Sequence, residues 1–243
     1  ALRCGLSVLG ISDHTPLPDD RWPGVRMPMT SLPVYIDAVH QAREAYPQLT
    51  ILMGLECEYV PEFHAFYEDE LLGRLGVDYL VCGQHWFLCR GEWLGCFGQS
   101  ETPERLTAFT DHTIRAMQTA LFTFVAHPDI FGNDYLVWDA HAESCAAAMA
   151  EAAAELRIPL EINALGFRRE TVNTPHGTRA MYPWPPFWET ASRFPIQVTI
   201  NSDAHRPADL TANIPDALNL AQRFNLPVID LLDRIRANQM RNS

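Results

Sequence analysis

The sequence predicts an α/β fold built on a mainly parallel sheet, and three observations support this. Short apolar runs alternate with longer amphipathic segments along the 243 residues, as in successive βα units. The chain is 47% apolar, so it can bury a sizeable core. No Gly/Ser linker, charge block or internal repeat divides it. We therefore expect a single domain over residues 1–243.

Six apolar runs are predicted to be strands. They cover residues 7–12, 50–57, 79–83, 123–126, 159–162 and 197–201. Three segments between them are predicted to be helices: 31–46 begins at an N-cap serine, Thr102-Pro103 begins the second, and 139–157 is rich in alanine. Residues 1–5 have the pattern of a helix end, with Gly5 as its stop. Because Ala1 is not an initiator methionine, we expect a chain truncated at its start.

Charge and composition exclude several classes of function. The chain has 18 basic and 30 acidic residues, a formal charge of −12, which gives no basic face for nucleic acid or an anionic membrane. All the basic residues are arginine, so Schiff-base and P-loop chemistry are excluded. The six cysteines show no C-x-x-C spacing and are predicted to be buried, reduced thiols. The sequence shows neither a long apolar span nor a signal peptide, so the expected location is cytoplasmic.

Imidazoles and carboxylates lie at the ends of almost all the predicted strands. In chain order they are His14, Glu56, Glu58, His85, His127, Glu161, Asp203 and His205. The carboxyl ends of the strands in a parallel barrel converge on one face, so we expect these residues to become neighbours. Residues two apart on a strand share a face, and Asp203 and His205 are therefore expected to point into the same site.

This mixture of side chains indicates a site for two or three divalent transition metals. Neutral imidazoles bind Zn, Fe or Mn, and carboxylates bridge neighbouring cations. A cluster of this kind generates hydroxide at neutral pH and neutralises an anionic substrate. Competing chemistries lack their motifs, because the chain has no G-x-S-x-G, H-E-x-x-H or G-x-G-x-x-G.

Six motifs appear in a specific order between Gly5 and about Pro207. They are Gly10-Ile-Ser-Asp-His14, Gly54-Leu-Glu-Cys-Glu-Tyr59, Gly83-Gln-His85, His127-Pro-Asp129, Glu161-Ile-Asn163 and Ser202-Asp-Ala-His205. This set resembles the PHP (polymerase and histidinol phosphatase) family, specifically its stand-alone histidinol-phosphate phosphatases. The resemblance implies a distorted (β/α)7 barrel with a trinuclear metal centre. The implied activity is a phosphoric monoester hydrolase that converts L-histidinol phosphate to L-histidinol and phosphate in histidine biosynthesis.

The same resemblance implies a role for each ligand. His14 and His205 would bind the outer metal. Glu56 would bridge two metals, of which His85 and His127 would hold one and Asp203 would serve the other. The family's first strand also carries an H-x-H motif, which nothing upstream of His14 supplies. We therefore expect the family's first strand, its loop and part of its first helix to be missing here.

Four residues are candidates for catalysis. Arg168 and Arg206 are predicted to neutralise charge on the phosphoryl group, whereas Arg169 is predicted to be a surface residue. The expected reaction is attack of hydroxide on phosphorus in line with the leaving alcohol. Asp13 and His205 are the candidate proton donors to that alcohol.

Seven other ionisable residues have expected positions. Acidic side chains at the rim would suit the cationic substrate, and Glu58 and Glu161 are the nearest candidates. The remaining histidines are expected at the surface: His40, His64, His112, His141 and His176.

Two alternative functions stay open. The same scaffold could hydrolyse another small phosphate ester, because the metals recognise phosphate and only the rim recognises the rest of the substrate. The chain could instead be a non-catalytic metal-binding barrel, like those attached to DNA polymerases. Its length leaves no room for a polymerase, and the ligand set is complete from His14 onward, which disfavours that alternative. The sequence makes no prediction of the oligomeric state.

Overall fold

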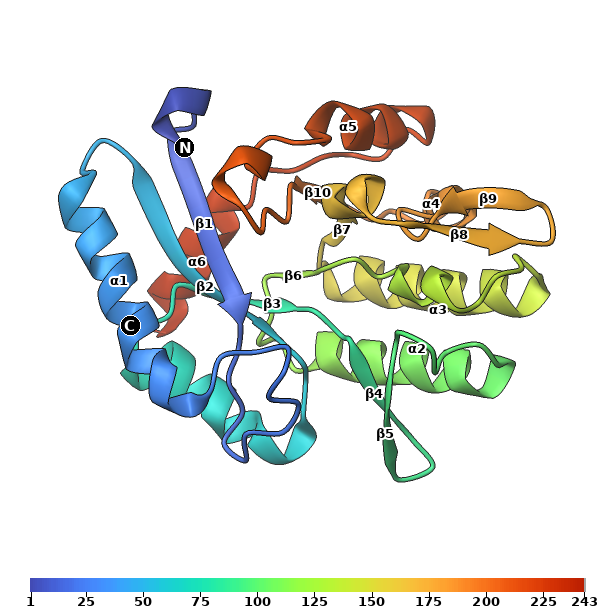
Figure 1. Cartoon of the computed structure of the whole chain (residues 1–243), viewed down its shortest axis with the longest axis horizontal. Helices are drawn as coiled ribbons and strands as arrows, with labels where there is room; N and C mark the ends of the chain where they lie inside the picture. The colour runs from blue at the N-terminus through green and yellow to red at the C-terminus, as the bar shows by residue number, and fades with distance from the viewer. Residues whose placement is uncertain (243) are drawn as a thin grey trace. The chain divides into compact units, whose positions relative to one another are not determined.

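The structure, a computed structural model, describes residues 1–242 and the side chains of residues 1–237. The fold is mixed α/β with short parallel strands, as predicted (Figure 1). Two compact units make up the chain: Ala1–Val81 with the C-terminal segment from Leu231, and Cys82–Asp230. The single domain over residues 1–243 stays a prediction.

In the first unit, three strands are neighbours in chain order: β1 (Val8–His14), β2 (Thr50–Cys57) and β3 (Tyr79–Cys82), whose last residue already belongs to the second unit. β1 and β2 pair in parallel, and this register sets His14 opposite Glu56. The helix α1 (Leu32–Ala45) lies alongside β2 (Figure 1). The predicted helix 31–46 is thus confirmed to within one residue at each end.

Two glycines make room for an aromatic ring against β1 and β2. A Cβ at Gly54 would lie 2.3 Å from Cζ of Tyr79, and a Cβ at Gly10 would lie 2.5 Å from its hydroxyl oxygen. Side chains essentially never approach so closely, so both positions require glycine while Tyr79 keeps this place. The ring of Tyr79 is buried and fixes the packing of all three strands.

The other elements of the first unit are short or C-terminal. They are the 3₁₀ turns Leu2–Cys4, Met29–Ser31 and Pro61–Phe63, the π-helix Phe66–Arg74, and α6 (Leu232–Asn242). The predicted helix end at residues 1–5 is a 3₁₀ turn, and Gly5 terminates it in the left-handed conformation with φ 75°.

In the second unit, β6 (Phe124–Val125), β7 (Leu160–Asn163) and β10 (Val198–Asn201) are parallel neighbours in that order. The amide of Ala126, directly after β6, donates to the carbonyl oxygen of Cys82 at 2.8 Å. In the pairing of β7 with β10, Glu161 lies opposite Thr199 and Asn163 opposite Asn201. All six predicted strands are therefore present.

Helices α2 (Pro103–Gln118) and α3 (Ala140–Leu156) lie side by side in the second unit (Figure 1). Each begins at a capping side chain: Thr102 accepts a hydrogen bond from the amide of Arg105, and Asp139 accepts one from the amide of Ala142. The predicted starts of both helices are confirmed. The unit also contains two shorter helices, α4 (Pro185–Ala191) and α5 (Ile214–Arg223), and the 3₁₀ turns Ile130–Asn133, Ala164–Arg168 and Pro207–Asp209.

Two antiparallel hairpins in the second unit were not predicted. They join β4 (Trp86–Cys89) to β5 (Glu92–Gly95) and β8 (Thr171–Thr174) to β9 (Gly177–Ala180). The first hairpin also corrects one prediction about a histidine. His112 on α2 is buried rather than exposed, because its ring packs edge-on against Trp93 of β5 at 5.3 Å between ring centroids.

The cysteines are free, as predicted, but their burial differs from the prediction at one position. Five are buried, whereas Cys4 in the N-terminal turn is exposed. None of the described helices has both the length and the apolar character that crossing a membrane requires.

Candidate metal centre

His14 and Glu56 meet at the carboxyl end of β1 and β2. Their strands pair in register, so the two side chains lie on neighbouring positions, with Nδ1 of His14 3.9 Å from Oε2 of Glu56. Both are partly buried. Asp13, the preceding residue, is exposed, and its Oδ1 accepts a hydrogen bond from the amide of His14 at 2.7 Å. The first unit therefore presents an imidazole and a carboxylate as adjacent potential ligands.

Glu58 is held by a buried arginine. Nη2 of Arg26 lies 3.3 Å from Oε1 of Glu58, and Nη1 of Arg26 donates to the carbonyl oxygen of Thr15 at 2.9 Å. The two side chains of the pair are only 2% and 1% exposed. Arg26 balances the charge of Glu58 inside the unit, which weakens the expectation that Glu58 serves a cationic substrate.

His85 and His127 form a second pair of imidazoles. His85 follows β3 and His127 follows β6. The ends of these two strands are joined by the hydrogen bond from the amide of Ala126 to the carbonyl oxygen of Cys82. Their ring centroids are 4.7 Å apart. His127 is buried and has a left-handed backbone, with φ 31°. A non-glycine residue in that conformation is uncommon, and its surroundings must hold it there.

Glu161 of β7 lies behind His127. Its Oε2 accepts hydrogen bonds from the amide of His127 at 3.1 Å and from Nδ2 of Asn163 at 2.9 Å, and its Oε1 accepts one from Nδ2 of Asn201 at 2.8 Å. Burial, together with the nearby charge of Asp203, raises the pKa of Glu161 to about 7. Glu161 is thus a buried acceptor in a polar network, not a rim residue.

Asp203 and His205 come together for a different reason from the one predicted. β10 ends at Asn201, so side-chain alternation along the strand does not apply to them. Asp203 instead has a left-handed φ of 45°, and its Oδ1 lies 3.5 Å from Nδ1 of His205. Nδ2 of Asn163 donates to the other carboxylate oxygen at 3.0 Å.

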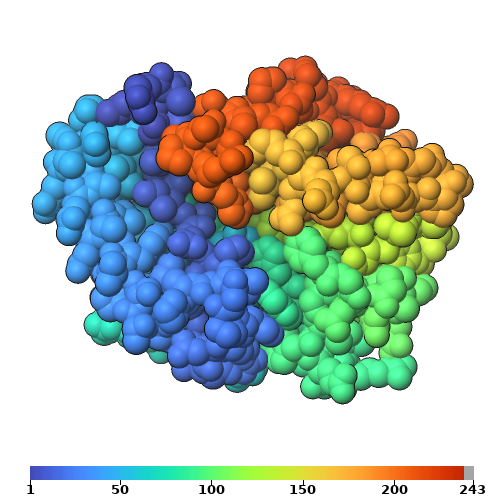
Figure 2. All heavy atoms as spheres, viewed as in Figure 1, coloured from blue at the N-terminus to red at the C-terminus, as the bar shows by residue number. Residues whose placement is uncertain are grey.

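The residues after β10 lie at the surface of the second unit, where they are coloured orange in Figure 2. The side chain of His205 is 61% exposed and that of Arg206 is 79% exposed. Nε of Arg206 lies 3.2 Å from Oδ2 of Asp209, whose side chain is 16% exposed. The side chains of His205 and Arg206 are accessible to a ligand from solvent.

Arg168 is engaged by backbone carbonyls. Nη1 donates to Ala164 and Ala212 at 3.1 and 3.0 Å, while Nη2 donates to Ser202 at 2.6 Å and to Asp203 at 3.4 Å. Arg168 therefore ties the turn after β7 to the loop after β10. Arg169 is exposed, as predicted, with its guanidinium 5.2 Å from the ring centroid of Phe97.

Asp129 is a buried carboxylate that the sequence analysis did not single out. Its Oδ2 accepts hydrogen bonds from the amide of Trp184 at 2.5 Å and from Nε1 of Trp188 at 2.9 Å. Burial raises its pKa to about 6. The signal was present in the His-Pro-Asp motif, since Asp129 stands two residues after His127 and anchors the segment carrying Tyr182, whose ring centroid is 5.9 Å from that of His127.

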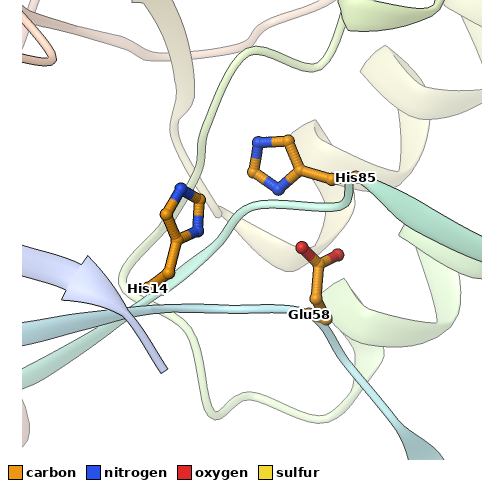
Figure 3. Close-up of side chains that lie close together, drawn as sticks. All are labelled: His14, Glu58 and His85. Atoms are coloured by element: carbon orange, nitrogen blue, oxygen red, sulfur yellow. The ribbon is translucent and has the colours of Figure 1, made fainter. Parts of the chain in front are cut away.

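The donor set of each unit fits divalent metal ions. Figure 3 draws three side chains, His14 and Glu58 from the first unit and His85 from the second, and each offers an imidazole nitrogen or a carboxylate oxygen that could hold an ion. Glu56 and His127 offer the same kinds of atom. Imidazole and carboxylate together are ligands for zinc, iron and manganese.

Comparison with known proteins identifies relatives of one kind. The chain is 26% identical over 239 residues to a protein of Deinococcus radiodurans named as a probable histidinol phosphatase, a match that covers 90% of this chain and 82% of that protein. The chain resembles the histidinol phosphatases. No protein-family model matches it.

Two solved structures have the same fold. The candidate histidinol phosphatase HisK of Listeria monocytogenes matches with a TM-score of 0.65 and 17% identity, over 86% of this chain and 88% of that one. The histidinol phosphate phosphatase of Lactococcus lactis, solved with zinc, L-histidinol and phosphate, matches with a TM-score of 0.65 and 15% identity, over 94% and 86%. The predicted resemblance is thus confirmed in sequence and in fold.

Proposed function

We propose that this chain is a metal-dependent phosphoric monoester hydrolase that converts L-histidinol phosphate to L-histidinol and phosphate. The observation that carries the proposal is the sequence likeness over nine-tenths of the chain to a histidinol phosphatase. The fold likeness supports it, because one of the structural relatives was solved with zinc, L-histidinol and phosphate. The distorted (β/α)7 barrel is part of this proposal.

Six residues are the proposed metal ligands. They are His14 and Glu56 in the first unit, and His85, His127, Asp203 and His205 in the second. Two features support this set. His14 is adjacent to Glu56 and His85 to His127, and the donor atoms are those that divalent transition metals prefer. We propose two or three ions, of zinc, iron or manganese.

Divalent ions held by these residues would supply hydroxide at neutral pH and would offset the charge of the phosphoryl oxygens. The chain's own residues then have separate tasks. Glu56 holds its carboxylate beside His14, and the network of Glu161 fixes the backbone of His127. Asp13 and His205, both exposed, are the candidates to give a proton to the leaving alcohol oxygen.

Arg206 is the better placed of the two arginines proposed to contact phosphate. To contact a ligand, Arg206 would give up one ion pair with Asp209, in which the arginine side chain is largely exposed. A surface ion pair is worth about 1 kcal/mol or less. Arg168 would have to release up to four carbonyl hydrogen bonds, each worth about 0.5–1.5 kcal/mol. We therefore propose that Arg206 meets the phosphoryl oxygens first, and that Arg168 acts mainly on the loop that carries Asp203.

The partner in this proposal is a small phosphorylated substrate, and the proposed location is the cytoplasm, where amino-acid biosynthesis takes place. The test compares esters on the purified chain loaded with Mn²⁺ or Zn²⁺. We expect kcat/KM for histidinol phosphate to exceed that for a simple alkyl phosphate by orders of magnitude, because contacts remote from phosphorus contribute to the transition state. Similar values for all esters would favour a broader phosphoesterase, and metal binding without turnover would favour a non-catalytic barrel.

A further inference from the structure

Glu161 is a buried carboxylate. In the proposed reaction it does not contact the substrate. It accepts three hydrogen bonds, from the amide of His127 and from the side-chain amides of Asn163 and Asn201. Glu161 is 3% exposed as a whole residue, so these donors take the place of water around its carboxylate. Burying such a group is costly unless it is hydrogen-bonded in this way.

The donors join Glu161 to two of the proposed metal ligands. One is His127, whose backbone amide bonds to Oε2 directly. The other is Asp203. Nδ2 of Asn163 donates one hydrogen bond to Glu161 and a second to the carboxylate of Asp203. Oδ1 of Asn163 also accepts a hydrogen bond from the amide of Leu165 at 2.9 Å, so the orientation of this amide group is fixed.

Both ligands have an unfavourable backbone conformation. His127 has φ 31° and Asp203 has φ 45°, in the left-handed region that side chains disfavour. Such a conformation is unfavourable for a residue with a side chain and persists only where the surroundings determine it. The one carboxylate of Glu161 is linked to both strained positions.

We propose that Glu161 is a positioning residue of the metal centre, which sets the places of His127 and Asp203 through one hydrogen-bond network. This inference rests on the proposed function only in taking these two residues as metal ligands. Groups that support metal ligands in this manner commonly change metal affinity or activity about 10–100-fold when they are removed.

The network itself suggests the variants. In Glu161→Gln, the amide oxygen can keep the bonds to His127 and Asn163, but the amide nitrogen then faces Nδ2 of Asn201, a donor against a donor. Asn201→Asp alone sets two carboxylates against each other. The double variant Glu161→Gln with Asn201→Asp restores a donor facing an acceptor. Thr199→Val is the matched control, since Thr199 is buried directly opposite Glu161 on β10.

The first readout is the affinity of the intact chain for Mn²⁺. It is measured from the EPR signal of the free ion. We expect Glu161→Ala to weaken binding about 10–100-fold. Each single amide or acid exchange should weaken binding less than the alanine variant, and the double variant should recover most of the loss. Thr199→Val should bind like the original chain.

The second readout uses the metal-free protein and does not depend on any activity. Hydrogen exchange of peptides covering residues 126–130 and 201–206 should be faster in Glu161→Ala than in Thr199→Val, because both strained segments lose a restraint. A general loss of stability would instead accelerate exchange across the whole second unit.

The inference is overturned if Glu161→Ala lowers the unfolding temperature but leaves Mn²⁺ affinity and local exchange as in Thr199→Val, or if the double variant recovers nothing. Failure of the proposed function has a different signature: the original chain would not hydrolyse histidinol phosphate, while the effects of Glu161 on exchange and Mn²⁺ binding remained.

Discussion

Nη2 of Arg168 donates a hydrogen bond to the carbonyl oxygen of Ser202 at 2.6 Å, one residue before Asp203. With the contacts to Ala164 and Ala212, this bond ties the loop after β10 to the turn after β7. The loop that carries a proposed ligand is therefore held by an arginine that sequence reasoning assigned to phosphate.

Arg168→Ala is expected to lower stability and activity together. Losing hydrogen bonds worth about 0.5–1.5 kcal/mol each should reduce the unfolding temperature by several degrees, since about 1 kcal/mol corresponds to roughly 2–4 °C in a chain of this size. Thermal unfolding and kcat/KM are measured on the same preparation. A loss of kcat/KM equivalent to about 2–4 kcal/mol with no change in unfolding temperature would show a phosphate contact instead.

Arg206→Ala is expected to have the opposite pattern. Its side chain is 79% exposed, so the unfolding temperature and Mn²⁺ binding should not change. If it meets the phosphoryl oxygens, kcat/KM for histidinol phosphate should fall by the equivalent of about 2–4 kcal/mol. Arg193→Ala, which removes another exposed arginine with an acidic partner, is the control. Equal kinetics for both variants would rule out a role for Arg206.

Glu56→Gln is expected to abolish turnover through the metals. The family resemblance implies that Glu56 would bridge two cations. A neutral amide is a weaker ligand than a carboxylate, so metal content per chain should fall and activity should disappear even though the fold persists. Metal analysis after dialysis, circular dichroism and the phosphatase assay give the three quantities. Glu62→Gln, at an exposed acidic position, serves for comparison. Full metal content with near-normal turnover would contradict the bridging role.

Glu58→Gln is expected to act on stability. Glu58 and Arg26 form an ion pair that is almost fully buried, and removing one charge from such a pair typically costs about 3–5 kcal/mol. The free energy of unfolding is measured by denaturant titration of the metal-free chain. A change in the free energy of unfolding of less than about 1 kcal/mol, as expected for an exposed ion pair, would show that the pair of Glu58 with Arg26 contributes little to stability.

Thiol labelling at pH 8 is expected to modify a single cysteine quickly. Cys4 is exposed, whereas the other five are buried. Burial raises the pKa of Cys57 to about 12, so almost none of this thiol is in the reactive thiolate form at pH 8. Ellman's reagent should therefore titrate one thiol in the native chain and all six after denaturation. Rapid labelling of Cys57, located by mass spectrometry, would contradict the packing around β2.

The main strands and helices could be predicted because each has a strong local pattern. The β4–β5 hairpin could not, because its turn is formed by Arg90 and Gly91, both with positive φ. Such a turn is usually signalled by Asn-Gly or Asp-Gly, and arginine at the first position hides it. The burial of His112 was missed for the same reason, since its partner Trp93 lies on that hairpin.

The chemistry of the candidate ligands was also readable from sequence, because imidazoles and carboxylates follow the strands. Their supports were less visible. Glu161 and Asn163 stand two apart on β7 and so share a face, which was a usable signal for their hydrogen bond. The left-handed backbone of Asp203 had no such signal, because it depends on Asn163 and Arg168, which lie 35–40 residues earlier in the chain.

The close approach of Tyr79 to Gly10 and Gly54 limits how this scaffold can change in laboratory evolution. A library randomised at either glycine would return mostly misfolded clones, because every other side chain begins with the Cβ that the ring excludes. A library that seeks a new ester specificity should instead vary exposed loop positions, such as those around His205 and Arg206. A failed substitution there leaves the strands intact.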